Sequence, residues 1–495
     1  MCYAQEGENL EKKKKIGFAS SMLFIGGSSL ISMVVGLLTT PIITRIVNPD
    51  SFGQLSIFTM YTNLAVMVLC LGMDQSLVRF YYEKDDINYK KEILRECMGL
   101  PLIVSTVCVT IALFLLFSGI VTFEFSTQMT TILVINIFAG LLYRFLAMAV
   151  RLNYKNRLYA GLNIITKISY VVFALVLVFF THVSDFSALA IATTLTSILV
   201  FIIAVISQRK YICIRKKHTI SDIVPYSELL KYGVPFIFSL GITTLFQSLD
   251  KISLNKYATY TEVGIYSSAM TLVHIFAILQ TSFNTVWAPV AIEHHLQNPH
   301  DKNYYRRAFE GITVLMFGMG IALILIKDVF ALLLGEKYRE AAYILPFLIF
   351  NPIMYTVSET TVCGIDFEKK SKVHILIAVV SCAVNYIGNT ILVPVLGGKG
   401  AAISTGLSYI VFFSMRTYLG KRFFDAGNNL IKFYALTIMV IGYAFYNTFY
   451  EFNIITVLFA ACCYVFLFAS YHKSIKWLLQ YILNYVGGFI KRKTN

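Results

Sequence analysis

Charged residues are scarce in this sequence. Only 14% of its 495 residues are charged, compared with about 25% in a typical soluble domain, and 57% are hydrophobic. No stretch is polar enough to form a soluble domain, whereas apolar runs of about 20 residues, each able to span a ~30 Å hydrocarbon layer, recur throughout. These features exclude a soluble enzyme, a secreted disulfide-rich domain and a nucleic-acid-binding domain. They predict an all-α polytopic membrane protein.

Motifs that would indicate cofactor chemistry are also missing. The nine cysteines include no Cys-x-x-Cys pair and have no His at metal-ligand spacing, so we predict neither a metal site nor a cofactor. No ATPase motif occurs, which leaves a gradient of H⁺ or Na⁺, or consumption of the product outside, as the energy source for any transport. The polar residues 1–15 lead directly into a long apolar run without a signal-peptide cleavage site, so the first span is predicted to be retained.

Apolar windows between charged or Gly/Pro-marked breaks predict about 14 transmembrane helices. Lys and Arg test this arrangement because they accumulate in cytoplasmic loops. On the side of the N terminus the connections hold 33 of the 42 Lys and Arg residues, and those on the opposite side hold 7. Both termini are therefore predicted to be cytoplasmic. The windows are 17–44, 53–72, 97–118, 129–150, 159–180, 187–206, 233–254, 262–290, 308–326, 341–363, 372–393, 401–419, 432–449 and 453–470.

Parts of the chain repeat at a nearly constant offset. Residues 45–56 align with 256–267, and each segment has a cation, a short loop and a Gly that opens the next helix. Residues 190–195 align with 402–407 at almost the same offset. Such a repeat indicates two parallel six-helix lobes, an arrangement found in transporters. We expect an N-terminal lobe (1–206), a cytoplasmic linker (207–232), a C-terminal lobe (233–419), and a final helix pair with a cytoplasmic tail (420–495).

Short motifs distributed over the chain carry a resemblance to a known family. They are Pro41-Ile-Ile-Thr-Arg45, Pro49, Phe52-Gly53, Leu71-Gly72, Arg79, Leu249-Asp250, Val263-Gly264-Ile-Tyr266, Ala269 and Gly400-Ala-Ala-Ile403. With the six-plus-six-plus-two arrangement of spans, they make the chain resemble the multidrug/oligosaccharidyl-lipid/polysaccharide exporter superfamily. Within that superfamily it is similar to the Wzx-type polysaccharide-unit flippases.

The resemblance implies a function, a location and partners. Such a flippase moves an undecaprenyl-diphosphate-linked oligosaccharide from the cytoplasmic to the outer leaflet of the bacterial inner membrane, by alternating access of a cavity between two lobes. It is a transporter rather than an enzyme, and it supplies repeat units for the O-antigen of lipopolysaccharide, for capsule or for exopolysaccharide. The implied partners are the lipid-linked oligosaccharide, membrane lipid and the polysaccharide polymerase machinery, with no nucleic acid.

A diphosphate that crosses an apolar layer needs fixed cations along its path. An ionisable residue inside the membrane costs about 2.5–3.5 kcal/mol on insertion scales, so it is a functional candidate. Arg144 and Lys167 lie at similar depth in neighbouring spans and are predicted to hold the diphosphate, and Arg151 extends the track toward the cytoplasm. The alternative is snorkelling of these long side chains to the headgroups.

Further candidates lie near the predicted outer ends of the lobes. Arg45 and Lys256 are repeat-related cations, and Asp250 and Lys251 precede Lys256 in the same span. We expect Asp250 to pair with Arg45 across the lobes and to close the outward gate. Ordinary interfacial anchoring is the alternative explanation, above all for Lys251 and Lys256.

Three more candidates have equally simple alternatives. Arg79 matches the family pattern at the inner face, where it is also explained as a positive-inside charge. His274, near the middle of its span, is a candidate for coupling to H⁺ or another ion, although a hydrogen-bonded structural role is an alternative. Glu359 is a candidate proton or cation acceptor, and it could equally neutralise a nearby lysine or cap a bent helix.

Other functions fit parts of the sequence. A drug or cation antiporter and a lipid II flippase would use the same fold, but export of organic cations favours an acidic cavity, whereas the intramembrane charges here lean positive. A membrane glycan polymerase or ligase would need reactive residues on large outer loops. The predicted outer loops 119–128, 181–186 and 394–400 are short and hold almost none.

Overall fold

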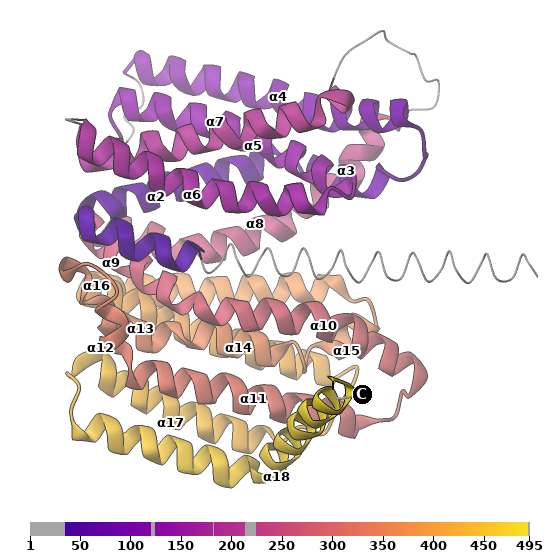
Figure 1. Cartoon of the computed structure of the whole chain (residues 1–495), viewed down its shortest axis with the longest axis vertical. Coiled ribbons are helices and arrows are strands. Elements are labelled where there is room, and N and C mark those ends of the chain that lie inside the picture. The colour runs from indigo at the N-terminus through magenta and orange to yellow at the C-terminus, as the bar shows by residue number, and fades with distance from the viewer. Residues whose placement is uncertain (1–34, 120–123, 182, 213–223, 494–495) are drawn as a thin grey trace, which may run out of the picture. The chain divides into compact units, whose positions relative to one another are not determined.

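The computed structural model describes residues 35–119, 124–181, 183–212 and 224–493. The regular elements of these segments are all helices, which confirms the predicted all-α fold (Figure 1). The chain divides into two compact units, Met1–Leu245 and Phe246–Asn495, and the boundary falls inside one long helix.

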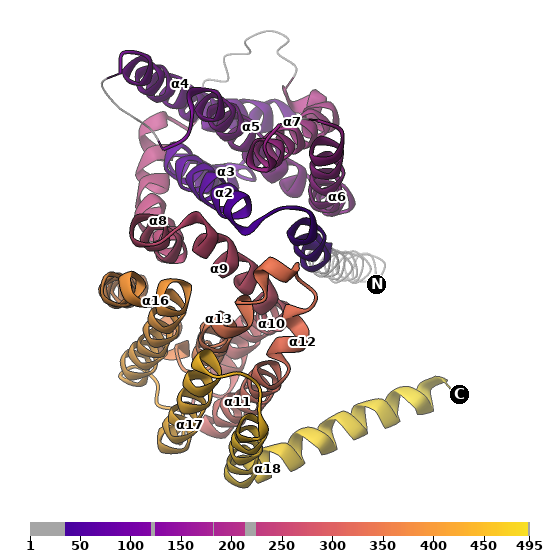
Figure 2. The ribbon, with the colours of Figure 1, turned by 90° about the vertical axis from the view of Figure 1, so that its left-hand side faces the viewer.

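In the first unit, an apolar helix Val35–Ile46 leads into α2. The Asn48 side chain caps α2 by accepting a hydrogen bond from the Ser51 N–H at 2.9 Å, and Pro49 follows where a missing N–H is tolerated. Several of the helices run alongside one another, as seen end-on in Figure 2. The helices are α2 (Pro49–Leu69), α3 (Met73–Phe80), α4 (Ile87–Phe117), α5 (Thr127–Leu152), α6 (Asn156–Phe180), α7 (Asp185–Ile212) and the first part of α8 (Tyr226–Tyr257).

A sharp bend separates α2 from α3. Leu71 and Gly72 both adopt left-handed backbone conformations, with φ of 52° and 68°. A Cβ atom added to Gly72 would lie 2.0 Å from the Gly233 carbonyl oxygen, so the backbones of α3 and α8 touch at two glycines. One turn farther along α3, the Ser76 hydroxyl donates to the Leu229 carbonyl of α8 at 2.6 Å. These contacts fix the direction of α3 after the bend.

The second unit contains two irregular helices. At His274 the chain bends by 52° between α9 and α10, and α16 changes direction at Gly397, where φ is 54°. The Glu262 carboxylate accepts a hydrogen bond from the Gly398 N–H at 2.8 Å and holds this turn. The helices are the rest of α8, α9 (Tyr260–Val273), α10 (Ile275–Gln297), α11 (Lys302–Leu325), α12 (Lys327–Ala331), the 3₁₀ helix η1 (Glu336–Tyr338), α13 (Ala341–Leu348), α14 (Phe350–Ser358), α15 (Cys363–Phe367), α16 (Ser371–Lys421), α17 (Leu430–Phe449) and α18 (Ile454–Lys493).

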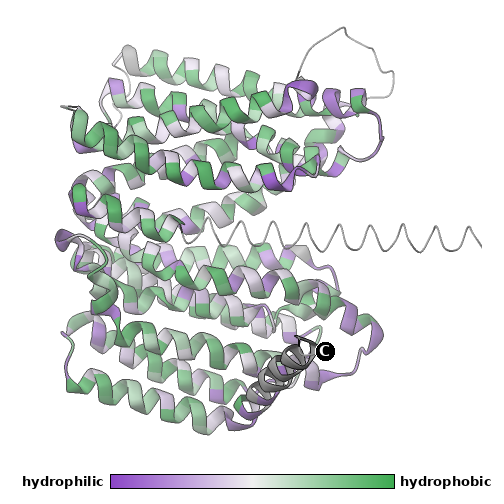
Figure 3. Ribbon diagram, viewed as in Figure 1, coloured by the Kyte–Doolittle hydropathy of each residue, from purple (hydrophilic) through white to green (hydrophobic). Residues whose placement is uncertain are grey.

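Eleven helices in the described part of the chain are long and apolar enough to cross a membrane, or 12 if the bent pair α9–α10 is one span. The count differs from the predicted 14 for two reasons. Of the predicted span 17–44 only residues 35–44 are described, within the short helix Val35–Ile46, and α16 runs through both predicted spans 372–393 and 401–419. Hydrophobic residues make up most of each unit, and hydrophilic residues are concentrated toward one end of each unit (Figure 3).

Candidate functional site: charged groups inside the two units

Arg144 of α5 is held by Asp74, which lies just after the bend between α2 and α3. The Arg144 Nη2 and Nε atoms both donate to Asp74 Oδ2, at 2.6 Å and 3.0 Å. The Asp74 side chain is 2% exposed and that of Arg144 is 38% exposed. Because α3 begins at Met73, Asp74 falls in its first turn, so the bend brings the carboxylate to the guanidinium. A partly exposed guanidinium that is fixed on one edge can still bind a second anion.

Lys167 is the twelfth residue of the 25-residue helix α6. Its side chain is exposed and makes neither a hydrogen bond nor an ion pair with any residue in the described segments. The Lys167 Cε atom lies 3.9 Å from the position that a Cβ atom of Gly36 would occupy, so the lysine runs beside helix Val35–Ile46. Of the two cations predicted to hold a diphosphate, Arg144 therefore has a counter-charge, whereas Lys167 has none within the described part of the chain.

The other predicted cations of the first unit lie on its surface. Arg151 is exposed in the last turn of α5, on the same face as Arg144 because the two are seven residues apart. Arg79 forms an exposed ion pair with Glu83 at 3.5 Å, a kind of contact that contributes little to stability. Arg45 is exposed near the end of helix Val35–Ile46.

Asp250 is buried in the second unit and receives four hydrogen bonds. The hydroxyls of Tyr266 and Thr405 donate to Oδ2 at 2.6 Å and 2.7 Å, and the Asn389 and Asn385 amides donate to Oδ1 at 2.9 Å and 3.1 Å. Donors from α9 and α16 thus surround a carboxylate of α8 and compensate for its removal from water. The predicted pairing of Asp250 with Arg45 would join the two units and stays a prediction.

The remaining candidates on α8 to α10 are more accessible. Lys251 is half-buried next to Asp250, and Lys256 is exposed near the end of α8. The Lys256 Nζ lies 5.0 Å from the centroid of the Tyr257 ring, a contact that suits an interfacial cation. His274 is exposed at the junction of α9 and α10.

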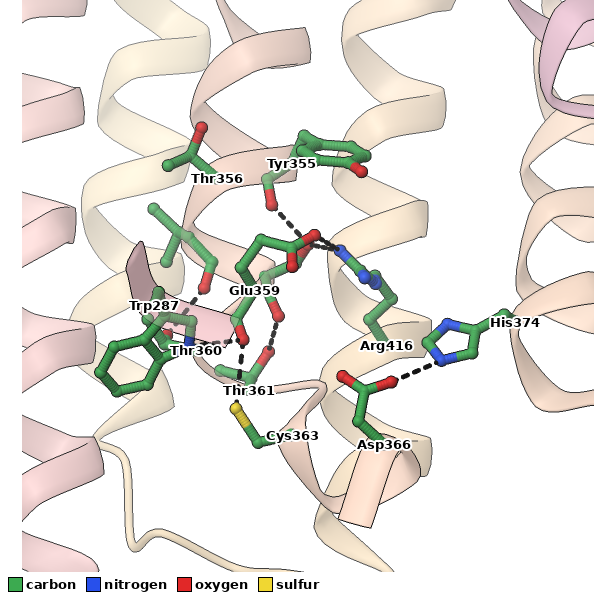
Figure 4. A network of polar contacts seen from close by, with 12 residues as sticks. Trp287, Tyr355, Thr356, Glu359, Thr360, Thr361, Cys363, Asp366, His374 and Arg416 are labelled. Carbon is green, nitrogen blue, oxygen red and sulfur yellow. Dashed lines mark hydrogen bonds and ion pairs between the residues drawn. The ribbon is translucent and has the colours of Figure 1, made fainter. Parts of the chain in front are cut away.

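Glu359 follows α14 and forms a mostly buried ion pair with Arg416 of α16 (Figure 4). The Arg416 Nη1 donates to Glu359 Oε1 at 2.7 Å and to the Ser358 hydroxyl at 2.6 Å. The Arg416 guanidinium also lies 5.4 Å and 5.1 Å from the ring centroids of Tyr355 and Phe412. Glu359 therefore neutralises a nearby cation, which is one of the alternative roles predicted for it. The cation is an arginine rather than the predicted lysine.

Several of these polar residues were missed from sequence. Asp74 follows the predicted window 53–72 by two residues and Arg416 lies in the last turn of the window 401–419, so neither stands out as a charge deep in an apolar run. Asn385 and Asn389 carried a usable signal, because two amides four residues apart share one face of an apolar helix. No group of three or more His, Cys, Asp or Glu side chains that could hold a metal occurs within the described ranges.

The arrangement of helices is that of known membrane transporters. A lipid II flippase, MurJ, in an inward closed conformation superposes with a TM-score of 0.69 at 15% identity, over 92% of this chain and 100% of that chain. A multidrug resistance MATE family transporter of the MOP superfamily, inward-facing, gives 0.60 at 14% identity, over 79% of this chain and 94% of that chain. A MATE transporter in complex with MaL6 gives 0.54 at 14% identity, with 82% and 95% covered. The chain thus shares the fold of these three proteins.

A family model is more specific than these folds. The model described as polysaccharide biosynthesis protein matches residues 18–295, which is more than half of the chain. The chain belongs to this polysaccharide biosynthesis family. No curated protein sequence matches the chain.

Proposed function

We propose that this protein flips an undecaprenyl-diphosphate-linked oligosaccharide from the cytoplasmic to the outer leaflet of the bacterial inner membrane. Membership of a polysaccharide biosynthesis family and the fold of a flippase support this proposal. The observation that carries it is Lys167, a cation near the middle of an apolar helix of the first unit that has no counter-charge among the described residues. Such a cation inside a membrane is costly unless an anionic ligand uses it.

The balance of charges away from the helix ends supports an anionic substrate. In the first unit two cations, Arg144 and Lys167, accompany one carboxylate, Asp74. In the second unit each carboxylate has a cation beside it, in the pairs Asp250–Lys251 and Glu359–Arg416. A diphosphate would meet Arg144 on its accessible edge and Lys167 without displacing another carboxylate. An exporter of organic cations would need the opposite balance.

The cargo has a second candidate. The likeness to a lipid II flippase extends over 92% of the chain, so a diphosphate-linked glycopeptide would suit the same cations. A host deletion separates the two. Loss of the gene should accumulate a lipid-linked oligosaccharide on the cytoplasmic side and abolish a surface polymer such as O-antigen, capsule or exopolysaccharide. Accumulation of lipid II instead would contradict the proposed cargo, and repeat units left unpolymerised outside would indicate a polymerase.

The role of Lys167 is tested with the purified protein in liposomes. Flipping of a fluorescent polyprenyl-diphosphate oligosaccharide should fall at least tenfold in the Lys167→Ala variant, because one charge-assisted hydrogen bond of about 1.5–3 kcal/mol is lost. Lys167→Arg should keep most of the activity, and Lys302→Ala, which removes an exposed lysine at the start of α11, serves as the control. Normal flipping in Lys167→Ala and in Arg144→Ala would overturn the proposal.

A further inference from the structure

The turn after α5 places a tyrosine where helices usually end in glycine. The Tyr154 N–H donates to the Arg151 carbonyl at 3.0 Å, and the Lys155 N–H donates to the Val150 carbonyl at 3.2 Å. This pair of bonds defines a Schellman motif, whose left-handed residue is most often glycine. Tyr154 fills that position with φ of 56°, which strains a residue with a bulky side chain.

The ring of Tyr154 is exposed and is paired with a second exposed ring. Tyr154 is 75% exposed and Tyr82 is 47% exposed, and their ring centroids lie 6.0 Å apart. The Tyr82 hydroxyl donates to the Leu152 carbonyl at the end of α5, and its ring meets Tyr81 edge-on at 5.4 Å. These contacts fix the position of the Tyr82 ring, whereas most of the Tyr154 ring is exposed and buries little surface. We call this pair of rings the tyrosine platform.

The tyrosine platform has a cation beside it. Arg151 immediately precedes Leu152, and its guanidinium makes no hydrogen bond or ion pair with the described residues. Arg151 is the chain neighbour of the residue whose carbonyl accepts the Tyr82 hydroxyl, and a second cation, Lys90, has its Nζ 5.9 Å from the centroid of the Tyr82 ring. Both tyrosines lie outside the candidate membrane-spanning segments, in the connections between Leu69 and Ile87 and between Leu152 and Asn156.

We propose that the tyrosine platform is a sugar-binding subsite, which stacks against a pyranose ring of the lipid-linked oligosaccharide. The proposal rests on the proposed function and adds a recognition element for the glycan. A pyranose presents one face of C–H bonds, and the negative face of an aromatic ring attracts such weakly positive hydrogens. Two adjacent rings at different angles suit a saccharide, and Arg151 would meet an anionic group of the same ligand.

Interfacial anchoring is the competing explanation, since tyrosines gather at the level of lipid headgroups. An anchor acts on every substrate alike, whereas a sugar subsite acts only when the ligand carries a glycan. The two explanations therefore differ in the ratio of affinities for two probes. One probe is a polyprenyl diphosphate that carries the oligosaccharide, and the other is the same polyprenyl diphosphate without sugar.

The Tyr154→Gly variant separates stability from recognition. Glycine relieves the left-handed strain, so the melting temperature should rise, while loss of the ring should reduce the preference for the glycan-bearing probe about fivefold to tenfold. Tyr154→Trp should keep the preference. Binding is measured with the full chain in nanodiscs.

A matched control exists in the second unit. Lys369 has φ of 53°, and its turn has the same two hydrogen bonds, Lys369 N–H to Asp366 and Lys370 N–H to Ile365, at 3.1 Å and 3.0 Å. Lys369→Gly should raise the melting temperature in the same way and leave the glycan preference unchanged. A Tyr154→Gly variant with unchanged preference would overturn the platform and leave the flippase intact. Wild-type protein that binds neither probe would overturn the proposed function, and the platform with it.

Discussion

Asp74 determines where the guanidinium of Arg144 lies, because two of the three arginine nitrogens donate to a single carboxylate oxygen. Asp74→Asn removes that charge and should lower the free energy of unfolding by about 1–2 kcal/mol. The loss stays below the ~3–5 kcal/mol of a fully buried pair because Arg144 still reaches water. The flipping rate should decrease as well, because Asp74 no longer holds the Arg144 guanidinium in the position in which it would bind a diphosphate. Thermal melting and liposome flipping measure the two effects.

A double variant separates structure from transport at this pair. In Asp74→Asn/Arg144→Gln both charges are gone, so part of the lost stability should return, while flipping should stay low because the cation is missing. Normal flipping in the double variant would contradict a role of Arg144 in binding the diphosphate.

At this scale the sequence indicates which residues are unusual but not which residues meet. Arg144, Lys167 and Asp250 stand out from sequence alone because a charge within an apolar run is rare. The partner of Arg144 cannot be predicted in the same way, since Asp74 reaches it only through the left-handed backbone at Leu71 and Gly72. Tyr154 gives no signal either, because a tyrosine after a helix is common and its backbone conformation is visible only in the structure.

Among the elements, the bend between α2 and α3 depends on a close approach of two glycines. A Cβ atom on Gly233 would lie 2.7 Å from the Gly72 carbonyl oxygen and 2.8 Å from the Ser76 hydroxyl oxygen. Gly233→Ala should therefore separate α3 from α8 and lower the free energy of unfolding by about 1–3 kcal/mol. Flipping should fall too, since α3 carries Asp74.

A second glycine of the first unit provides the control for this prediction. Gly161 lies in α6, and a Cβ atom there would meet nothing within 4 Å. Gly161→Ala should leave the melting temperature unchanged or raise it slightly, because alanine favours a helix by about 0.5–1 kcal/mol over glycine. Equal melting temperatures of Gly233→Ala and wild type would show that the crossing tolerates a side chain.

Helices themselves are predicted well from apolar length, whereas their interruptions are not. The predicted window 262–290 contains the 52° bend at His274, and no proline or glycine marks that position in the sequence. Gly397 is a visible turn signal, and α16 does change direction there. A hydropathy window shows which segments are apolar enough to span a membrane. A bend depends on packing against neighbouring helices, and hydropathy carries no information about that packing.

For the whole molecule, the distribution of Lys and Arg predicts which ends of the helices face the cytoplasm. The predicted inner connections hold 33 of the 42 residues, and they include the turns at Tyr154 and Lys369. Single cysteines in a chain freed of its nine natural ones test this orientation. A membrane-impermeant thiol reagent applied to intact cells should label cysteine at Asp185 and at Lys337, but label cysteine at Lys155 and at Lys369 only after permeabilisation. The reversed pattern would place the tyrosine platform outside the cell, where it would meet the product rather than the incoming substrate. The same four variants thus decide whether Tyr82 and Tyr154 can select the glycan before transport.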